Sequence, residues 1–582
     1  MLFRSSLFAF FILLVGCKEK QGTGVLHANE SDLKVGQATP VATLKQHLAD
    51  TFKVNLESGA FVFGYADQRS VDVIVEIYGP DHKRLASFDN PARGHEPYQF
   101  ITTAPGIHRI VIAPFKDYVG DYTLVISKAE ALAQDPEGRT EQLVGASLGT
   151  EEVTPGVSIA VQKEGKIIYR KGFGYANLEE DIKNTPTTIF HIASVSKQFT
   201  AFAIAMLADQ GKLSLTDDIR KYLPELQDFG SVITINHLVH HTSGLRDQWS
   251  LLTMAGWRMD DVITLKQILR LISRQKDLNF KPGEEMVYCN TGFTLMAEIV
   301  SRITGESFAD WTKKNMFDPL EMKNTFFYDD HEKIVKHRAY SYHEVPGGFK
   351  KSVLNYANAG ATSLFTTVED LSLWAVNFEK VKVGNQNVMD MMKQRFVLNK
   401  GDTITYAFGQ EIEKYKGLNA FSHGGGDAGY RTYFLRFPDQ HFSISVFSNL
   451  ASFNPGALSY SLADLYLAKE LVAEKEKPAP PVEPEPKKVP FDPSQVKLSE
   501  FTGTFYSPEL MTSYTLTVMN DTLTAHHQRH DDLKLLPVKA DGFSTAILGN
   551  LDFTRNKANQ ITGLKASNGR VRNLVFVRQV SN

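Results

Sequence analysis

Cysteine is nearly absent from this chain of 582 residues, which contains only Cys17 and Cys289. If the N-terminal modification of Cys17 expected below takes place, Cys289 is the one thiol left, so no intramolecular disulfide is expected. Cys289 could act as a nucleophile in principle. A small, buried packing residue is the preferred interpretation of a lone cysteine of this kind.

An excess of charge of either sign is also missing. Lys and Arg number 63 against 66 Asp and Glu, which leaves a formal net charge of -3. No block of basic residues resembles a nucleic-acid footprint, so we expect no nucleic-acid partner. The chain is 42% apolar, 22% charged and much longer than one hydrophobic core usually organises. We therefore expect three or four folding units.

The N-terminal hydrophobic run is too short to cross a bilayer as a stable helix. An uncharged stretch from Leu7 to Val15 follows Arg4 and ends at Cys17, a pattern typical of a secretory signal. The letters LVGC at 14–17 resemble the lipobox of bacterial lipoproteins, in which the cysteine becomes the lipidated first residue. This resemblance implies a signal peptide over 1–17 and lipidation of Cys17 at the cell envelope. The polar residues after it lack periodicity, which favours a tether over 18–38. An ordinary signal peptide with an incidental cysteine is the alternative.

Alternating apolar residues predict a small β-sandwich over 39–130. A passive spacer is the simplest interpretation of this module, since no aromatic platform or metal-ligand cluster in it names a ligand. Residues 474–493 contain seven prolines mixed with charges, which indicates an extended linker. Alternation returns over 494–582 and predicts a compact all-β domain. One alternating set of the sandwich is Val71, Val73, Val75 and Ile77, and another is Tyr122, Leu124 and Ile126.

The segment over 135–473 mixes strand and helix periodicity. Strand pairs are expected near its two ends, with turns at Glu164-Gly165 and Pro438-Asp439, and helices are expected after Ser194, over 291–304 and over 368–378. Terminal strands with helices between them predict an α+β domain whose antiparallel sheet brings the ends of the segment together.

The pattern S-x-x-K is not informative by itself, because it occurs four times in this sequence. The copy at Ser194 and Lys197 differs from the others in its context. It opens an amphipathic helix, and the sequences YCN at 288–290 and HGG at 423–425 follow it in order. Y-x-N also occurs at 175–177, in the wrong order, and at 356–358, without the PGE lead-in at 282–284 and the following helix.

The ordered set resembles the three motifs of the serine β-lactamase and penicillin-binding protein superfamily. The nearest branch is the class C β-lactamase-like esterases and D-amino-acid peptidases, in which the third motif often begins with His rather than Lys. The phrases HHTSGL at 240–245, KPGEEMVYCN at 281–290 and TTVEDLSLW at 366–374 are similar to the family as well. The resemblance covers about 330 residues and implies a β-lactamase/transpeptidase-like domain that needs no cofactor or metal.

The resemblance implies a catalytic role for Ser194, Lys197 and Tyr288. A serine in the first turn of a helix lies near the positive end of the helix dipole, and a lysine one turn later shares its face. Burial lowers the pKa of a lysine and makes it a base, which a serine nucleophile requires. Tyr288 would complete a coupled proton acceptor, and the sequence does not decide whether Tyr288 or Lys197 holds the proton.

The resemblance also implies substrate-binding positions. Asn290 would bind a substrate amide and Lys197. Gly424 and Gly425 would let a substrate backbone approach the edge of a strand, because they have no side chain. The family pattern places an oxyanion hole at the backbone N–H groups of Ser194 and Gly426.

His423 departs from the lysine that many relatives have there. An unperturbed histidine is mostly neutral at pH 7, so recognition of a free substrate carboxylate should weaken. This favours esters, amides or D-amino-acid-containing peptides over penicillins. A true β-lactamase and a non-catalytic binder of cell-wall peptides remain alternatives. The loops at 249–259 and 335–351 are expected to wall the pocket, but they do not name the substrate, and oligomeric state is not indicated.

Two groups of histidines have spacings that resemble zinc sites. His237 and His241 have helical spacing, but Leu238 stands where a zinc-protease motif needs glutamate, so packing is the preferred interpretation. The histidines at 526, 527 and 530 are expected on an exposed turn rather than around a metal.

Overall fold

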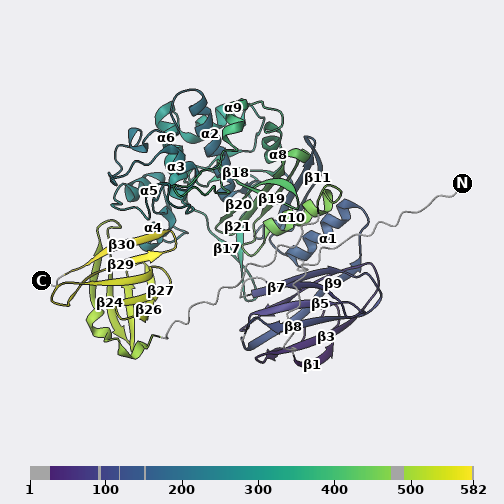
Figure 1. Ribbon diagram of the computed structural model, residues 1–582. Helices are drawn as coiled ribbons and strands as arrows, with labels where there is room; N and C mark the ends of the chain where they lie inside the picture. The colour runs from purple at the N-terminus through teal and green to yellow at the C-terminus, as the bar shows by residue number, and fades with distance from the viewer. Residues whose placement is uncertain (1–25, 90–93, 117, 150–152, 473–490, 580–582) are drawn as a thin grey trace. The chain divides into compact units, whose positions relative to one another are not determined.

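The structure is a computed structural model that describes residues 26–89, 94–116, 118–149, 153–472 and 491–579 (Figure 1). The predicted signal peptide with Cys17 and nearly all of the predicted proline-rich linker lie outside the described residues. The chain divides into two compact units, one formed by residues up to 154 with 460–481, the other by 155–459 with 482–582. No helix among the described residues is long and apolar enough to cross a membrane.

The first unit contains the predicted β-sandwich. Its two sheets have the strand orders β1-β3-β8-β5-β6 and β2-β9-β4-β7. Alternate residues of β5 are fully buried, as the alternation predicts, because successive side chains of a strand point to opposite faces. The strands are β1 (Leu26–Asp32), β2 (Ala42–Leu44), β3 (Leu48–Leu56), β4 (Ala60–Gln68), β5 (Val73–Tyr78), β6 (Arg84–Phe88), β7 (Gly94–Ile101), β8 (Gly106–Pro114) and β9 (Gly120–Ala131). Helix α1 (Pro136–Leu148) follows them.

The sandwich begins earlier than the sequence predicts. Strand β1 pairs in parallel with β3, and Val35 forms a bridge with Ile126. Part of the expected tether over 18–38 is therefore a strand of the sandwich. The sequence LHANESD of β1 has no alternation of apolar and polar residues, so it could not be recognised as a strand from the sequence.

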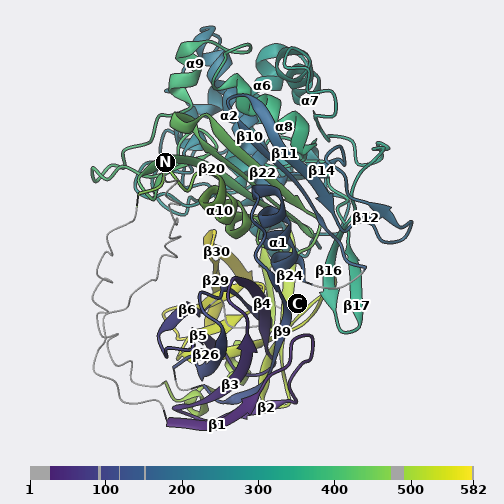
Figure 2. The ribbon, with the colours of Figure 1, turned by 90° about the vertical axis from the view of Figure 1, so that its right-hand side faces the viewer.

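The second unit contains the predicted α+β domain around a six-stranded antiparallel sheet. The strand order is β11-β10-β22-β21-β20-β19, and Val157 of β10 pairs with Ser448 of β22, so the sheet joins the two ends of the domain as expected. Figure 2 shows β20, β22, β10 and β11 side by side. The strands are β10 (Val157–Lys163), β11 (Lys166–Phe173), β19 (Glu411–Tyr415), β20 (Leu418–Asp427), β21 (Tyr430–Phe437) and β22 (Phe442–Ser448).

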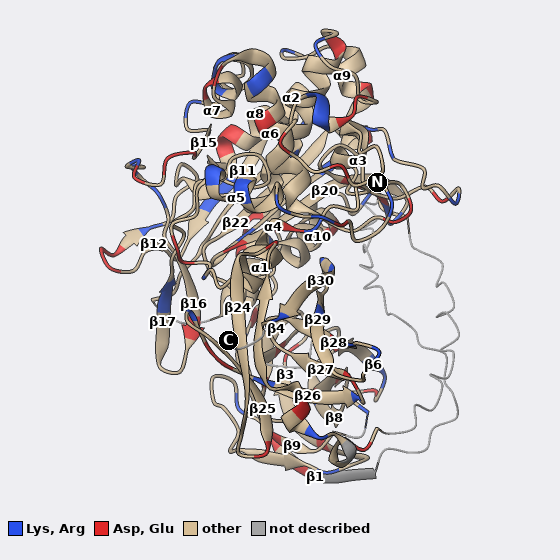
Figure 3. Ribbon diagram, turned by 90° about the vertical axis from the view of Figure 1, so that its left-hand side faces the viewer, with Lys and Arg blue, Asp and Glu red and all other residues tan. Residues whose placement is uncertain are grey.

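Helices cover the sheet and build the body of this domain. Helix α8 (Val368–Asn377) packs on β10 and β22, while α2 (Lys197–Asp209) packs on α6 (Asn290–Thr304). Ten of the thirteen residues of α2 are buried, which makes it the central helix of the core. The remaining helices of this domain are α3 (Ile235–Val239), α4 (Gln248–Met254), α5 (Leu265–Ile272), α7 (Phe308–Thr312) and α9 (Gln386–Met391), and the division between the two units falls within α10 (Pro455–Tyr466). Figure 3 shows basic and acidic residues interspersed around α7, α8 and α9.

Short elements connect these layers. They are strands β12 (Tyr175–Asn177), β13 (Ile182–Lys183), β14 (Phe190–His191), β15 (Phe326–Phe327), β16 (Ser341–Val345), β17 (Gly348–Ser352) and β18 (Leu364–Thr366), with the helical turns η1 (Ala193–Ser196), η2 (Ile219–Lys221), η3 (Lys313–Phe317), η4 (Pro438–Gln440), η5 (Pro493–Gln495) and η6 (Leu498–Phe501).

The C-terminal all-β domain is a closed eight-stranded barrel in which β23 pairs with β30. Its strands are β23 (Gly503–Ser507), β24 (Thr512–Met519), β25 (Thr522–His527), β26 (His530–Lys539), β27 (Gly542–Thr545), β28 (Gly549–Arg555), β29 (Ile561–Asn568) and β30 (Val571–Arg578). The expected exposed turn is wrong for the three histidines, because His526 and His527 end β25 and His530 begins β26, and none of them is exposed. His527 is 8% exposed, and its ring centre lies 4.6 Å from that of Tyr514.

Candidate active site

Ser194 lies in the tight turn η1 between β14 and α2. Ala193, the residue before it, has a φ of 49°, a left-handed conformation that is strained for a residue with a Cβ. Neighbouring strands hold this turn in place, since the Thr432 hydroxyl donates to Ile192 O at 2.9 Å. A Cβ on Gly425 would lie 2.3 Å from the same oxygen, so glycine is needed there for β20 to approach the turn. Gly425 thus supports the nucleophile turn, while Gly424 and Gly426 line the pocket.

Lys197 is fully buried, and its amine has three acceptors. Nζ lies 3.1 Å from Ser194 Oγ, 2.9 Å from Asn290 Oδ1 and 2.6 Å from Ala361 O. The serine, the lysine and the asparagine of the first two motifs therefore meet as the sequence predicts. Burial lowers the pKa of the Lys197 amine to about 7, against the opposing effect of nearby carboxylates such as Asp247. A substantial fraction of the amine is neutral at pH 7, and its lone pair can then accept the serine proton.

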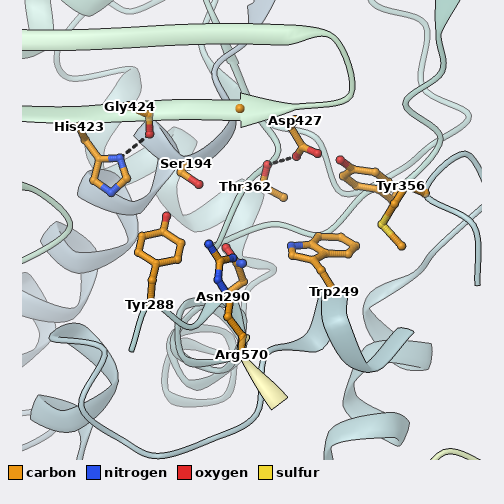
Figure 4. Close-up of a pocket in the computed structure, with 12 residues that line it drawn as sticks. Ser194, Trp249, Tyr288, Asn290, Tyr356, Thr362, His423, Gly424, Asp427 and Arg570 are labelled. Atoms are coloured by element: carbon orange, nitrogen blue, oxygen red, sulfur yellow. Dashed lines mark hydrogen bonds between the residues drawn. The ribbon is translucent and has the colours of Figure 1, made fainter. Parts of the chain in front are cut away.

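Tyr288 lies against both of these groups. The Lys197 amine is 4.8 Å from the centre of its ring, and Figure 4 shows its hydroxyl pointing toward Ser194 and His423. Among the described residues this buried hydroxyl has no hydrogen-bond partner. Burial raises the pKa of the phenol, and the Ser194 hydroxyl and the Arg570 charge only partly offset that effect. The phenol therefore keeps its proton at neutral pH, and Lys197 is the group that can be deprotonated in the resting site.

His423 is neutral, as its sequence position suggested. Its Nδ1 lies 2.6 Å from Gly424 O, which can only accept a hydrogen bond, so the ring proton is on Nδ1. Nε2 is then unprotonated and accepts a hydrogen bond from the Tyr406 hydroxyl at 3.0 Å. Burial, with the Lys197 charge nearby, lowers the pKa of the imidazole to about 3. Strand β20 therefore offers the pocket no fixed positive charge at this position.

Asn290 is held by a residue that the sequence analysis missed. One carboxylate oxygen of Asp247 accepts the Asn290 backbone N–H at 2.7 Å and its side-chain amide at 2.8 Å. This fixes the amide so that Oδ1 faces Lys197. Asp247 also caps α4 by accepting the Trp249 N–H at 3.0 Å. Its position before a helix was a signal for the cap, but nothing local indicated the contact with Asn290.

Histidines next to the site are packing residues, as the sequence analysis preferred. His237 completes a capping box at the start of α3. The His241 ring packs at a tilt against Tyr288, with the ring centres 4.2 Å apart, and its Nδ1 accepts the Cys289 N–H at 3.0 Å. Cys289 is buried and unpaired, and burial raises the pKa of its thiol to about 12, so it is no nucleophile. No group of three His, Cys, Asp or Glu that could hold a metal occurs within the described ranges.

The site opens into a cavity of about 360 Å³. Trp249 and Met259 line it, as expected of the segment 249–259, but Trp249 lies in helix α4 rather than in a loop, and no residue of 335–351 lines the cavity. Tyr356, which belongs to the rejected second Y-x-N sequence, also lines it. The other unforeseen lining residues are Thr362, Asp427 and Arg570, and the Thr362 hydroxyl donates to Asp427 Oδ2 at 2.7 Å (Figure 4). The full lining is Ser194, Trp249, Met259, Tyr288, Asn290, Tyr356, Thr362, His423, Gly424, Gly426, Asp427 and Arg570.

Comparison with known proteins agrees with this geometry. The family model described as Beta-lactamase matches residues 137–468. The chain belongs to the β-lactamase family. The match covers the α+β domain and most of helix α1, which precedes it. The serine, lysine, tyrosine and histidine motifs therefore all lie within the matched region.

Relatives of this β-lactamase-family chain include hydrolases and penicillin-binding proteins. It is 28% identical over 295 residues to a D-aminopeptidase of Gluconobacter oxydans, across 51% of this chain and 56% of the relative. It is 29% identical over 333 residues to penicillin-binding protein 4* of Bacillus subtilis, across 53% of this chain and 71% of the relative. The match thus spans little more than half of the D-aminopeptidase.

A solved structure shows the same fold. The octameric penicillin-binding protein homologue of Pyrococcus abyssi aligns with a TM-score of 0.52 and 23% identity, covering 76% of this chain and 99% of the homologue. The predicted class, an α+β β-lactamase-like domain with flanking β domains, is confirmed.

Proposed function

We propose that this protein hydrolyses ester or amide substrates, including peptides that contain D-amino acids, through an acyl-enzyme on Ser194. The observation that carries the proposal is the contact between Ser194 Oγ and the buried, low-pKa amine of Lys197. A non-catalytic binder has no need to hold a buried lysine against a serine, since burial of an amine costs free energy.

In the proposed first step, neutral Lys197 accepts the Ser194 proton while Oγ bonds to the substrate carbonyl carbon. The backbone N–H groups of Ser194 and Gly426 stabilise the oxyanion, and each such donor typically contributes a few kcal/mol. Tyr288 then gives its proton to the leaving group and recovers one from Lys197, and the bond from the carbonyl carbon to the leaving group breaks. In the second half, neutral Lys197 accepts a proton from water while the water oxygen bonds to the acyl carbon. The bond from that carbon to Ser194 Oγ then breaks, and Oγ takes the proton back from Lys197.

Replacement of the proposed nucleophile tests this function. Ser194→Ala should lower kcat/KM for a chromogenic aryl ester at least about 10³-fold without unfolding the protein. Ser273→Ala is the matched control, because Ser273 also precedes a lysine by three residues but lies outside the pocket. Mass spectrometry after treatment with a fluorophosphonate should find the adduct on the Ser194 peptide. Wild-type turnover by Ser194→Ala, or the absence of an adduct, would exclude the mechanism and favour a binder.

A chromogenic cephalosporin distinguishes the alternative of a true β-lactamase. Rapid turnover of the cephalosporin would identify a true β-lactamase, whereas stable acylation of Ser194 would favour the esterase or peptidase.

We further propose that the protein is exported and anchored to the cell envelope through acylated Cys17. The support is the lipobox-like LVGC sequence after a short hydrophobic run. Stable anchoring needs more than one acyl chain on the N-terminal cysteine. Cys17→Ser removes the acylated thiol, so it should move the protein from the detergent phase to the aqueous phase of a Triton X-114 extract.

A further inference from the structure

The C-terminal barrel contributes one residue to the pocket. Arg570 lies in the turn between β29 and β30, and the carbon at the centre of its guanidinium is 5.1 Å from the centre of the Tyr288 ring. Figure 4 shows the Arg570 side chain rising from the barrel toward the group formed by Tyr288 and Asn290. Residues of both the barrel and the α+β domain therefore line the cavity.

The turn is fixed to the catalytic body through its backbone. Arg570 O accepts the Asp247 N–H at 3.2 Å and the Asn279 side-chain amide at 2.9 Å. The Arg572 N–H donates to Asn279 Oδ1 at 2.7 Å, and Arg572 O accepts from the Arg246 guanidinium at 3.1 Å. Asp247 also orients Asn290, which contacts Lys197. A short chain of hydrogen bonds therefore connects the backbone of Arg570 to the catalytic lysine.

The Arg570 guanidinium itself has no acceptor within the described parts of the chain. Other arginines of the barrel that face the catalytic body are paired: Arg572 with Glu285 at 2.9 Å, and Arg529 with Asp261 at 2.5 Å. An unpaired guanidinium at the wall of a cavity offers two parallel N–H donors, the geometry that binds a carboxylate.

No other lining residue of the described cavity supplies a permanent positive charge. His423 is neutral, and Lys197 uses its donors on protein acceptors. The one acidic lining residue, Asp427, accepts from Thr362, and burial raises its pKa to about 7, so its negative charge is incomplete at neutral pH. The pocket can therefore accept an anionic group beside Arg570.

We infer that Arg570 selects substrates whose leaving group carries a carboxylate, which makes the C-terminal barrel a specificity element of the enzyme. The leaving-group side follows from the position of Arg570 over Tyr288, the residue that protonates the leaving group. This inference rests on the proposed function. It also replaces the expectation from His423 alone that carboxylate recognition is weak, because the missing charge comes from a different domain.

A matched pair of esters tests the inference in the full-length protein. One is 4-acetoxybenzoate, whose leaving group carries a carboxylate, and the other is its neutral methyl ester. The measured quantity is the ratio of kcat/KM for the anionic ester to kcat/KM for the neutral ester, which cancels effects of a variant on the serine chemistry itself. Arg570→Gln should lower this ratio about tenfold, mainly through KM of the anionic ester, and Arg570→Lys should retain part of it.

The control is Lys557→Gln, which removes a positive charge from an exposed turn of the same barrel and should leave the ratio unchanged. Thermal unfolding checks that each variant is folded. If the wild type hydrolyses both esters through Ser194 and Arg570→Gln keeps the ratio within twofold, the role of Arg570 is excluded while the hydrolase stands. If the wild type hydrolyses neither ester and Ser194 takes no fluorophosphonate, the proposed function fails and the inference fails with it.

Discussion

The contact between the barrel and the catalytic body contains a buried ion pair whose removal should be costly. Arg246 Nη1 lies 2.7 Å from Glu509 Oε2, and the two side chains are 0% and 3% exposed. Glu509 also accepts the Lys276 N–H at 2.8 Å, and the Arg246 guanidinium donates to Gln275 Oε1 at 3.1 Å. Glu509→Gln keeps the shape of the side chain but leaves the arginine charge buried without its counter-ion.

Breaking one side of a buried pair typically costs about 3–5 kcal/mol, which corresponds to a change of at least about 10²-fold in the equilibrium between folded and unfolded protein. Urea unfolding followed by tryptophan fluorescence measures this loss, because all four tryptophans, at 249, 257, 311 and 374, lie in the catalytic domain. Since Arg246 also holds Arg572 O, the preference for the anionic ester should fall in the same variant.

A surface pair on the same barrel provides the control. Glu500 contacts Arg555 at 3.0 Å, and its side chain is 41% exposed, so Glu500→Gln should cost less than about 1 kcal/mol. The double variant Arg246→Met with Glu509→Met should be more stable than Glu509→Gln alone, since no buried charge is left unpaired. A Glu509→Gln protein within 1 kcal/mol of wild type would refute the reasoning.

Two further outcomes follow from the pKa shifts at the site. Because burial lowers the pKa of Lys197 to about 7 and only the neutral amine accepts a proton, kcat/KM for a neutral ester should rise with pH through about 7, while Lys197→Arg should be inactive across pH 5–9. A flat profile in the wild type would contradict this role. Tyr288→Phe should lower kcat about 10²-fold or more, because it removes the proton donor, while urea unfolding changes by less than about 1 kcal/mol, because the ring keeps its packing against His241. An unaltered kcat would remove Tyr288 from proton transfer.

Local sequence signals located the groups whose spacing defines the chemistry. Ser194 and Lys197 are three residues apart and lie within one helical turn. Asn290 begins the helix that packs on α2, so the order of the motifs was enough to predict that the three residues meet. Alternation likewise identified the interior of the sandwich and the barrel, because one face of each strand is buried.

Contacts between distant segments had no such signal. Arg570 is a single arginine in a Gly-Arg turn, and only the docking of the barrel brings it to Tyr288. Asp427 directly follows the glycine-rich third motif, so its position could have been suspected, but its bond to Thr362 depends on the fold. Strand β1 escaped notice because its pairing partner, rather than its own pattern, makes it a strand.

The pairing of β10 with β22 has a consequence for how the catalytic domain is made. Val157 of β10 pairs with Ser448 of β22, so β10 can pair along this edge only after roughly 290 further residues have been synthesised. Nascent chains that end before β22 leave one edge of β10 open, a surface prone to aggregation. Folding of this domain is therefore completed late, and a chaperone that shields the early hairpin during synthesis should raise the yield.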